Sequence, residues 1–223
     1  MQFRNRAEAG QKLAEALQHY KSQHPVVLAL PRGGVPVAAE VAADLDAPLD
    51  LVLVRKVGVP FQPELAMGAV VDGHDPTIVR NEDVIQLCDI DDAVFKTVCD
   101  HELAEIERRR KLYIGKRRRP DIAGRTAIVI DDGIATGATT RAALLAIRKQ
   151  KPKRLVLAVP VGPRDSIEAL RADADEIVCL DDKEFMGAIG FYYEDFQQIT
   201  DEEVIQTLAK FDRKAQALGH PAA

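Results

Sequence analysis

The chain has 223 residues, 47% of them hydrophobic and 29% charged, which fits one well-buried soluble domain and excludes a disordered or fibrous protein. Its formal net charge of −5 argues against nucleic acid as a partner, because nucleic-acid-binding domains usually carry a basic face. No apolar run reaches signal-peptide length or the roughly 20 residues of a membrane span, so we expect a cytoplasmic protein without a membrane partner.

The first elements read as helix, strand, tight turn and helix. Asn5 and Glu8 have capping-box spacing and predict a helix that starts near Asn5. The apolar run Val26–Leu30 predicts a strand, Pro31–Gly34 a turn, and the Ala- and Val-rich Val35–Ala43 a helix. This order is the first half of a βαβ unit.

The next part of the chain is less regular. Leu51–Val54 predicts a second buried strand. Its prolines and glycines make Lys56–Asp72 mostly loop, with a short strand near Ala69–Val71. Apolar residues at helical spacing then predict a helix over about Asp91–Lys116.

The second half alternates strands and helices. The predicted elements are strand Thr126–Ile130, helix Thr139–Gln150, strand Arg154–Pro160, a helix from about Arg164, strand Glu176–Leu180 and a helix that starts at the Thr200/Glu203 capping pair. Such alternation predicts an α/β fold with an open, mostly parallel sheet flanked by helices. Ligands of these sheets bind beyond the carboxyl ends of the strands, so we expect the loops after Leu30, Val54, Ile130, Val159 and Leu180 to share one crevice.

The strongest motif follows the strand that ends at Ile130. Two acids, Asp131 and Asp132, lead into small residues and threonines at the start of a helix. Backbone amides at a helix N-terminus favour an anion, so a phosphate fits on Ala135–Thr139, with hydroxyl bonds from Thr136 and Thr139. Vicinal sugar hydroxyls fit the two carboxylates. The alternative is that the acids merely cap the helix while glycines turn the chain.

This motif resembles the 5-phosphoribosyl 1-pyrophosphate (PRPP) motif of type I phosphoribosyltransferases: a hydrophobic strand, two acids, small residues, Thr-Gly and Thr. The similarity covers about 26–180. The resemblance implies the type I phosphoribosyltransferase fold in a single domain of residues 1–223. Its core would be about 24–180, with a small hood subdomain and the C-terminal helix at about 181–218.

The resemblance also implies the site. Asp131, Asp132 and Lys56 would be the catalytic residues, with the two acids on the ribose hydroxyls. The implied PRPP contacts are Arg32, Gly33, Gly34, Arg55, Lys56, Asp131, Asp132, Gly133, Ala135, Thr136, Gly137, Ala138, Thr139 and Thr140.

Three groups of cations could meet the pyrophosphate. Pro31–Gly34 matches the family's pyrophosphate loop, in which Arg32 would contact the anion. Arg55 and Lys56 follow the second predicted strand, and their alternative role is as solvated charges. A dinucleotide-binding turn is disfavoured because Gly-x-Gly-x-x-Gly is absent and these cations replace the usual acid. Arg108–Arg119 lies where the family has a closing loop; the alternatives are an exposed helix face or an RNA-contacting patch.

The implied reaction transfers the phosphoribosyl group to a nitrogen acceptor such as a nucleobase and releases pyrophosphate. Mg²⁺ would be held mainly by PRPP, with no direct protein ligand. Ala135 replaces the acid typical of enzymes for 6-oxopurines, which disfavours hypoxanthine and guanine and leaves adenine-type, orotate-type and other acceptors open.

Aromatic residues gather in the predicted hood: Phe185, Phe191, Tyr192, Tyr193 and Phe196. Phe185, Phe191 and Tyr192 are the candidate base pocket, because stacking suits a flat ring. The alternative is that these rings pack the C-terminal helix.

We expect a homodimer. A PRPP-sensing regulator with the same fold is a second hypothesis, and a plain α/β scaffold is a third.

Overall fold

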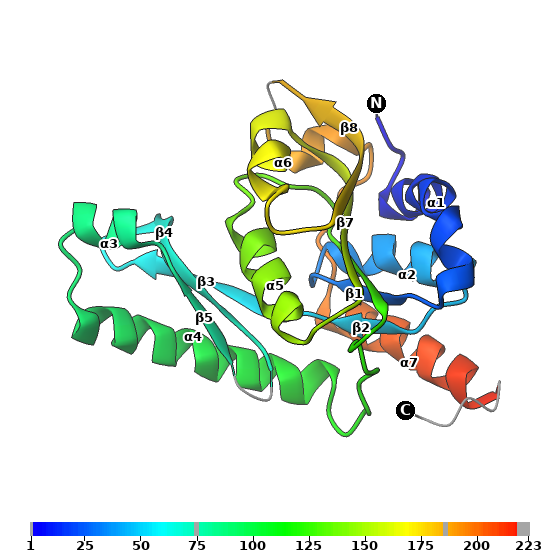
Figure 1. Ribbon diagram of the computed structural model, residues 1–223, viewed down its shortest axis with the longest axis horizontal. Coiled ribbons are helices and arrows are strands. Elements are labelled where there is room, and N and C mark those ends of the chain that lie inside the picture. The colour runs from blue at the N-terminus through cyan, green and yellow to red at the C-terminus, as the bar shows by residue number, and fades with distance from the viewer. Residues whose placement is uncertain (1, 74–75, 185–186, 218–223) are drawn as a thin grey trace.

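A five-stranded parallel sheet forms the centre of the computed structural model, which describes residues 2–73, 76–184 and 187–217. The strands lie in the order β2-β1-β6-β7-β8 (Figure 1). Their bounds are β1 Val26–Ala29, β2 Leu49–Leu51, β6 Thr126–Ile130, β7 Arg154–Pro163 and β8 Glu176–Lys183. The predicted open parallel sheet is therefore confirmed.

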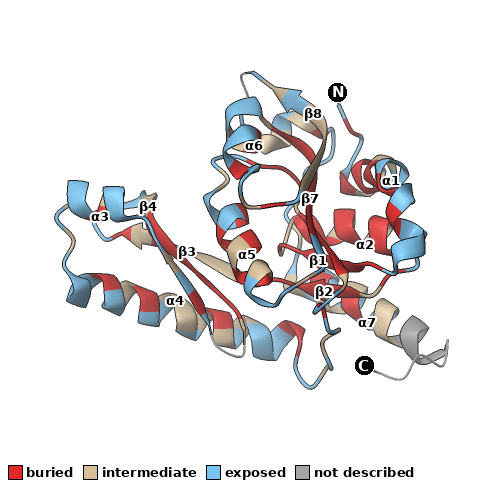
Figure 2. Cartoon of the chain, in the orientation of Figure 1, coloured by how far each residue is buried: buried red, intermediate tan, exposed pale blue. Residues whose placement is uncertain are grey.

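Helices cover both faces of this sheet. The bounds are α1 Arg6–Ala16, α2 Gly34–Asp44 and α7 Asp201–Ala217 on one side, and α5 Ala138–Lys149 and α6 Arg164–Leu170 on the other. Successive strand residues point to opposite faces, so Val27 and Ala29 join one buried cluster while Val26 and Leu28 join the other. Burial on both faces explains why β1 is entirely apolar and β6 nearly so (Figure 2).

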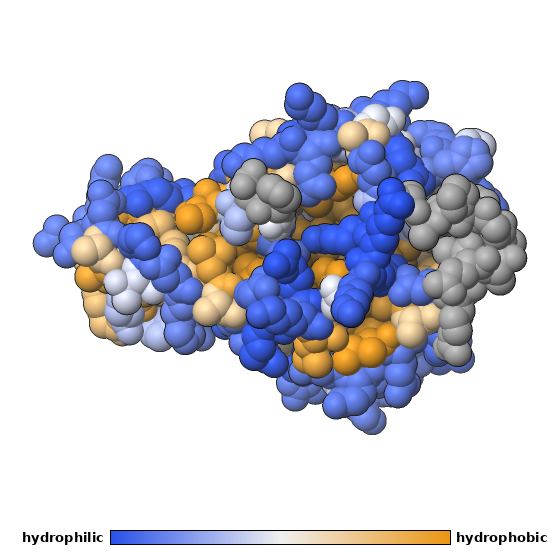
Figure 3. All heavy atoms as spheres, turned by 90° about the horizontal axis from the view of Figure 1, so that it is seen from below, coloured by the Kyte–Doolittle hydropathy of each residue, from blue (hydrophilic) through white to orange (hydrophobic). Residues whose placement is uncertain are grey.

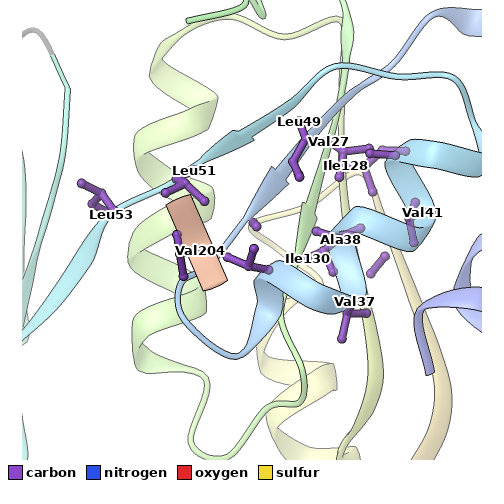
Figure 4. Packing of buried hydrophobic residues seen from close by; sticks show 14 of the residues in the cluster. Val27, Val37, Ala38, Val41, Leu49, Leu51, Leu53, Ile128, Ile130 and Val204 are labelled. Atoms are coloured by element: carbon purple, nitrogen blue, oxygen red, sulfur yellow. The ribbon is translucent and has the colours of Figure 1, made fainter. Parts of the chain in front are cut away.

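The first cluster joins α2 and α7 to the sheet. Figure 4 shows Val37, Ala38 and Val41 of α2 facing Val27, Ile128 and Ile130, with Val204 of α7 beside Leu51. The predicted caps of the outer helices are also present. The Asn5 side chain accepts a hydrogen bond from the Glu8 amide at 3.0 Å, and Thr200 exchanges hydrogen bonds with Glu203.

Residues 54–113 form a projecting subdomain that extends to the left in Figure 1. It has a three-stranded antiparallel sheet in the order β3-β4-β5 and two helices. The bounds are β3 Val54–Val59, β4 Gln62–Val71, β5 Thr77–Arg80, α3 Glu82–Leu87 and α4 Asp92–Tyr113. The side chains of Val57 and Met67 belong to the first core cluster and those of Ala69 and Val71 to the second, so both clusters continue into this sheet.

Two sequence predictions are corrected here. The predicted loop over Lys56–Asp72 is mainly the β3–β4 hairpin, because its prolines lie at the hairpin turn and the outer end of β4, where a strand tolerates them. Gly58 lies at a register shift where an added Cβ would come within 2.5 Å of the Pro63 carbonyl oxygen. The predicted strand Leu51–Val54 is also wrong, since β2 ends at Leu51 and Val54 opens β3 in the other sheet.

The chain returns to its N-terminus after β8. Short 3₁₀ helices lie at η1 Gln18–Gln23 and η2 Ile189–Tyr192. Phe3 forms a parallel bridge with Tyr193, and the Phe3 amide donates to the Tyr192 carbonyl at 2.8 Å. The predicted hood range, 181–218, thus includes the end of β8, this returning segment and α7, and the assignment as a hood stays a prediction.

Figure 3 shows the underside of the molecule, where hydrophilic side chains predominate and smaller apolar areas lie between them. Within residues 2–73, 76–184 and 187–217, no helix combines the length and apolar character that crossing a membrane requires.

Candidate active site

The two acids of the motif leave the carboxyl end of β6 together. Asp132 is buried, with 8% of its surface exposed, and its amide donates to Asp131 Oδ1 at 2.9 Å. Loss of water contacts, reinforced by the neighbouring Asp132 charge, raises the pKa of Asp131 well above its usual range. Burial and the neighbouring carboxyl group therefore both disfavour the charged form of Asp131.

Asp132 is held by residues from both ends of the chain. Arg6 Nε of α1 donates to Asp132 Oδ2 at 2.7 Å, and the Tyr193 hydroxyl donates to the Asp132 carbonyl oxygen at 2.6 Å. Sequence reasoning gave Arg6 no role and considered Tyr193 only as a stacking ring. Neither contact has a sequence signal, because the partners lie far apart in the chain.

The predicted phosphate loop, Ala135–Thr139, lies open to solvent at the N-terminus of α5. Ala135, Thr136, Ala138 and Thr139 are exposed, and Gly137 has a φ of 76°, a left-handed conformation that favours glycine. The Ser166 hydroxyl of α6 donates to the Ala135 carbonyl at 2.9 Å and supports the loop. Gly133 and Thr140 are buried on either side of the exposed residues. The loop thus presents a free helix N-terminus, the arrangement that favours a bound anion.

The predicted pyrophosphate loop, Pro31–Gly34, packs directly against the acids and contains a cis peptide bond between Pro31 and Arg32. A Cβ on Gly33 would lie 2.1 Å from Asp132 Oδ2, and one on Gly34 would lie 2.7 Å from the Ile130 carbonyl oxygen. Glycine at both positions allows the backbone to approach the acids this closely. The loops after β1 and β6 therefore share one site, as predicted.

Arg32 points from this loop toward α7. Its Nη1 lies 3.4 Å from Asp201 Oδ1, and both side chains are about one-third exposed. Asp201 also accepts a 2.5 Å hydrogen bond from the Tyr113 hydroxyl at the end of α4. Arg32 therefore lies at the site edge with a weak ionic partner that a stronger anion could replace.

Arg55 and Lys56 lie in the projecting subdomain. Arg55 Nε donates to Glu102 Oε2 at 2.6 Å, and Lys56 Nζ lies 3.1 Å from Glu64 Oε2. Their expected position at the carboxyl end of a core strand is wrong, because both belong to β3. In this arrangement each cation is paired within its own subdomain.

The basic stretch 108–119 is mainly structural. Arg108 and Arg109 of α4 pair with Glu105 on the same helix. Arg119 Nε donates to Asp50 Oδ2 at 2.7 Å and its Nη1 to Asp72 Oδ2 at 2.8 Å, while Arg117 pairs with Asp50 and Asp212. These ion pairs link β2 to the end of β4, so the expectation of a closing loop here does not match the structure.

Two of the three predicted base-pocket residues, Phe191 and Tyr192, lie in η2. Phe191 is 76% exposed, Tyr192 is half-buried, and Phe185 lies outside the described residues. Ile189 covers the motif loop, since a Cβ on Gly133 would lie 2.8 Å from Ile189 Cγ2. The segment 189–197 therefore borders the loop that follows β6.

The parallel sheet, the paired acids at the end of β6 and the open N-terminus of α5 define a type I phosphoribosyltransferase fold. The chain belongs to the phosphoribosyl transferase domain family, whose model matches residues 4–195. Mg²⁺ generally accompanies PRPP in this family. Among the described residues, no group of three or more His, Cys, Asp or Glu side chains is arranged to hold a metal ion.

The names of two Mycobacterium tuberculosis relatives agree with this assignment. Proteins from two Mycobacterium tuberculosis strains, provisionally named phosphoribosyl transferases, are each 45% identical over 211 residues, which is 95% of this chain and 47% of theirs. The chain thus spans about half their length. The solved structure of TT1426 from Thermus thermophilus is 41% identical, with a TM-score of 0.82, and the match covers 95% of this chain and 99% of that one. The purine phosphoribosyltransferase of Pyrococcus horikoshii Ot3 is far more distant, with 17% identity and a TM-score of 0.41 over 77% of this chain and 78% of that one.

Proposed function

We propose that the protein transfers the 5-phosphoribosyl group from PRPP to a nitrogen acceptor such as a nucleobase, with release of pyrophosphate. The observation that carries this proposal is the contact of Gly33 and Gly34 with Asp132 and Asp131, beside the exposed N-terminus of α5. Two anion-binding loops on either side of a carboxyl pair match the layout of PRPP, which has a phosphate, a diol and a pyrophosphate.

Each part of PRPP has a candidate partner. The 5-phosphate would accept hydrogen bonds from the amides and hydroxyls of Ala135–Thr139, where the α5 dipole also favours negative charge. Asp131 and Asp132 would bind the ribose hydroxyls. The pyrophosphate would lie on Gly33 and Gly34 with Arg32, and Mg²⁺ would enter as part of the substrate, held by PRPP oxygens and water.

The proposed reaction needs positioning and charge stabilisation. The bond from C1 to the pyrophosphate oxygen breaks, and the electron pair leaves with pyrophosphate as an oxocarbenium-like centre forms. The acceptor nitrogen then donates its lone pair to C1 and loses a proton to solvent. Arg32 stabilises the departing charge, and Arg55 and Lys56 would join it only after release from Glu102 and Glu64.

The acceptor would enter beside the 189–197 segment. Tyr192 and Phe191 are the described aromatic side chains there, and we retain both, together with Phe185, as the proposed base pocket. Ala135, in place of an acid, supports an acceptor other than hypoxanthine or guanine. A cytoplasmic location and a homodimer are part of the same proposal.

A PRPP-sensing regulator is the second candidate. The pairing of Arg55 and Lys56 with acids of their own subdomain favours it, because the predicted catalytic Lys56 and the predicted PRPP contact Arg55 are then unavailable to pyrophosphate. Such a protein would bind PRPP and release no pyrophosphate.

Calorimetric titration of the full chain with PRPP and Mg²⁺, followed by a pyrophosphate-release screen over nucleobases, separates these candidates. Binding with base-dependent release supports the transferase and identifies its acceptor. Binding without release with any base tested supports the sensor, and absence of binding rejects both.

The acid pair supplies the first prediction. Asp131→Asn and Asp132→Asn should each weaken PRPP binding by about 1–3 kcal/mol, the usual cost of a hydrogen-bond partner lost in a buried site. The same titration measures this, with Asp83→Asn on α3 as the control, because Asp83 is exposed on a helix of the projecting subdomain. Unchanged affinity in both acid variants would remove the carboxyl pair from the proposed site.

A further inference from the structure

Arg6 is the one buried cation in the described part of the chain, with 8% of its surface exposed. It lies in the first turn of α1, where the sequence suggests an ordinary polar helix face. Burying a guanidinium is costly unless the charge is paired and its donors are satisfied. The contacts that compensate for burying the Arg6 charge therefore need to be identified.

Three contacts fix the guanidinium. Arg6 Nε donates to Asp132 Oδ2 at 2.7 Å, and Nη1 donates to the Gln197 carbonyl oxygen at 2.8 Å. The guanidinium carbon lies 3.8 Å from the centre of the Phe196 ring. The guanidinium thus contacts the ring while two of its nitrogens donate to separate oxygens, and the several donors of arginine suit this arrangement better than the single ammonium group of lysine.

The Asp132 carboxyl group is confined from two sides. Arg6 holds Oδ2 on one side, and on the other Gly33 approaches so closely that even a Cβ would lie 2.1 Å from the same oxygen. The Tyr193 hydroxyl fixes the backbone of Asp132 at the same time. The carboxyl group thus has little freedom to turn away from the loop where the ribose is proposed to lie.

The charge of Arg6 also distinguishes the two acids. Asp131 and Asp132 are adjacent, and like charges at this separation oppose each other. Arg6 forms its ion pair with Asp132, whereas burial and the neighbouring Asp132 charge raise the pKa of Asp131. The two acids therefore differ in their surroundings, and Asp132 is the one whose orientation Arg6 controls.

We propose that Arg6 is a positioning residue of the PRPP site, which holds the Asp132 carboxylate for the ribose hydroxyls without touching PRPP itself. This inference rests on the proposed function. It makes α1 part of the site and, through Gln197 and Phe196, connects α1 to the segment that borders the proposed acceptor position.

The test is a double-mutant cycle on PRPP affinity in the full chain. Arg6→Gln should weaken PRPP binding at least about tenfold, and Arg6→Lys should recover only part of the loss. In an Asp132→Asn background, Arg6→Gln should cause no further loss, because its effect passes through Asp132. Arg4→Gln is the matched control, since the Arg4 side chain is 73% exposed.

A purely structural role would give a different result. Arg6→Gln would then lower the unfolding temperature while the folded protein kept its affinity for PRPP. The Arg6→Gln/Asp132→Asn variant leaves no unpaired charge and provides a folded form even if the single variant unfolds. Affinity of Arg6→Gln within twofold of wild type, or losses that multiply in the double variant, would overturn the proposal. Failure of the wild-type chain to bind PRPP would instead reject the proposed function and this inference with it.

Discussion

At the scale of single residues, the site depends on glycines, because their lack of a side chain allows close backbone packing. Gly33 lies against Asp132 with no space for a methyl group. Gly33→Ala should therefore displace either the acid or the loop and reduce PRPP affinity at least about tenfold, together with a loss of about 1–3 kcal/mol in stability from overpacking. Titration and thermal unfolding measure the two effects.

The cause of the stability loss in Gly33→Ala can be tested separately. If the clash with the carboxyl group destabilises Gly33→Ala, then the stability cost of Gly33→Ala should be much smaller when it is measured in an Asp132→Ala background, although PRPP binding stays weak. Equal unfolding temperatures of wild type and Gly33→Ala would contradict the close packing of loop and acid.

The raised pKa of Asp131 makes stability depend on pH. In the range between the ordinary aspartate pKa, about 4, and the raised value, the folded chain keeps a proton that the unfolded chain releases, so stability falls as pH rises. Asp131→Asn removes this titration. The variant should gain stability relative to wild type by up to about 1.4 kcal/mol for each pH unit in that range. Thermal unfolding from pH 4 to 8 measures the difference, and a constant difference across this range would argue against a protonated Asp131.

At the scale of elements, Arg119 links the two sheets. It joins Asp50 of β2 to Asp72 at the end of β4, and both carboxylates are almost fully buried. Arg119→Met should destabilise the fold by about 3 kcal/mol, because Asp50 keeps only Arg117 and Asp72 keeps only the more distant Arg110 as a cationic partner. Arg108→Met is the control, with an expected cost below about 1 kcal/mol for an exposed pair on one helix. Chemical denaturation should show the difference. Equal denaturation midpoints for Arg119→Met and Arg108→Met would mean that the Arg119 ion pairs do not stabilise the fold.

The strands of the core were predictable because their burial on both faces produces long apolar runs, as at Thr126–Ile130. The hairpin was not predictable in this way. Pro60, Pro63 and Gly58 are typical loop residues, and only the pairing of β3 with β4 shows that they occupy a turn, an outer strand end and a register shift.

The sequence likewise located the two loops of the site but not what holds them. The acids and glycines form short local motifs, whereas Arg6 reaches Asp132 from 126 residues away. No local pattern marks a contact between residues so distant. Cations that follow a strand also look alike in sequence whether they face a ligand or, like Lys56, a neighbouring acid.

At the scale of the whole molecule, three distant parts of the chain meet at Asp201. It contacts Arg32 of the pyrophosphate loop and Tyr113 of α4 from the start of α7. If Arg32 binds pyrophosphate, Asp201 competes for it. Asp201→Asn should then raise PRPP affinity by about two- to fivefold, the value of a partly exposed ion pair. Glu202→Gln is the control because Glu202 is exposed at the next position, and weaker binding by Asp201→Asn would show that Asp201 supports the site.

The order of strands in the large sheet has a consequence for how the chain acquires its shape during synthesis. The projecting subdomain lies in sequence between β2 and β6, and its own strands pair with sequence neighbours. By contrast, β1 leaves the ribosome long before its partner β6, since Val26 pairs with Ala127. Local pairings form early and distant ones late. We therefore expect the inserted hairpin and α4 to form first. The pairing of β1 with β6, and with it the contact between Pro31–Gly34 and the two acids, should form later.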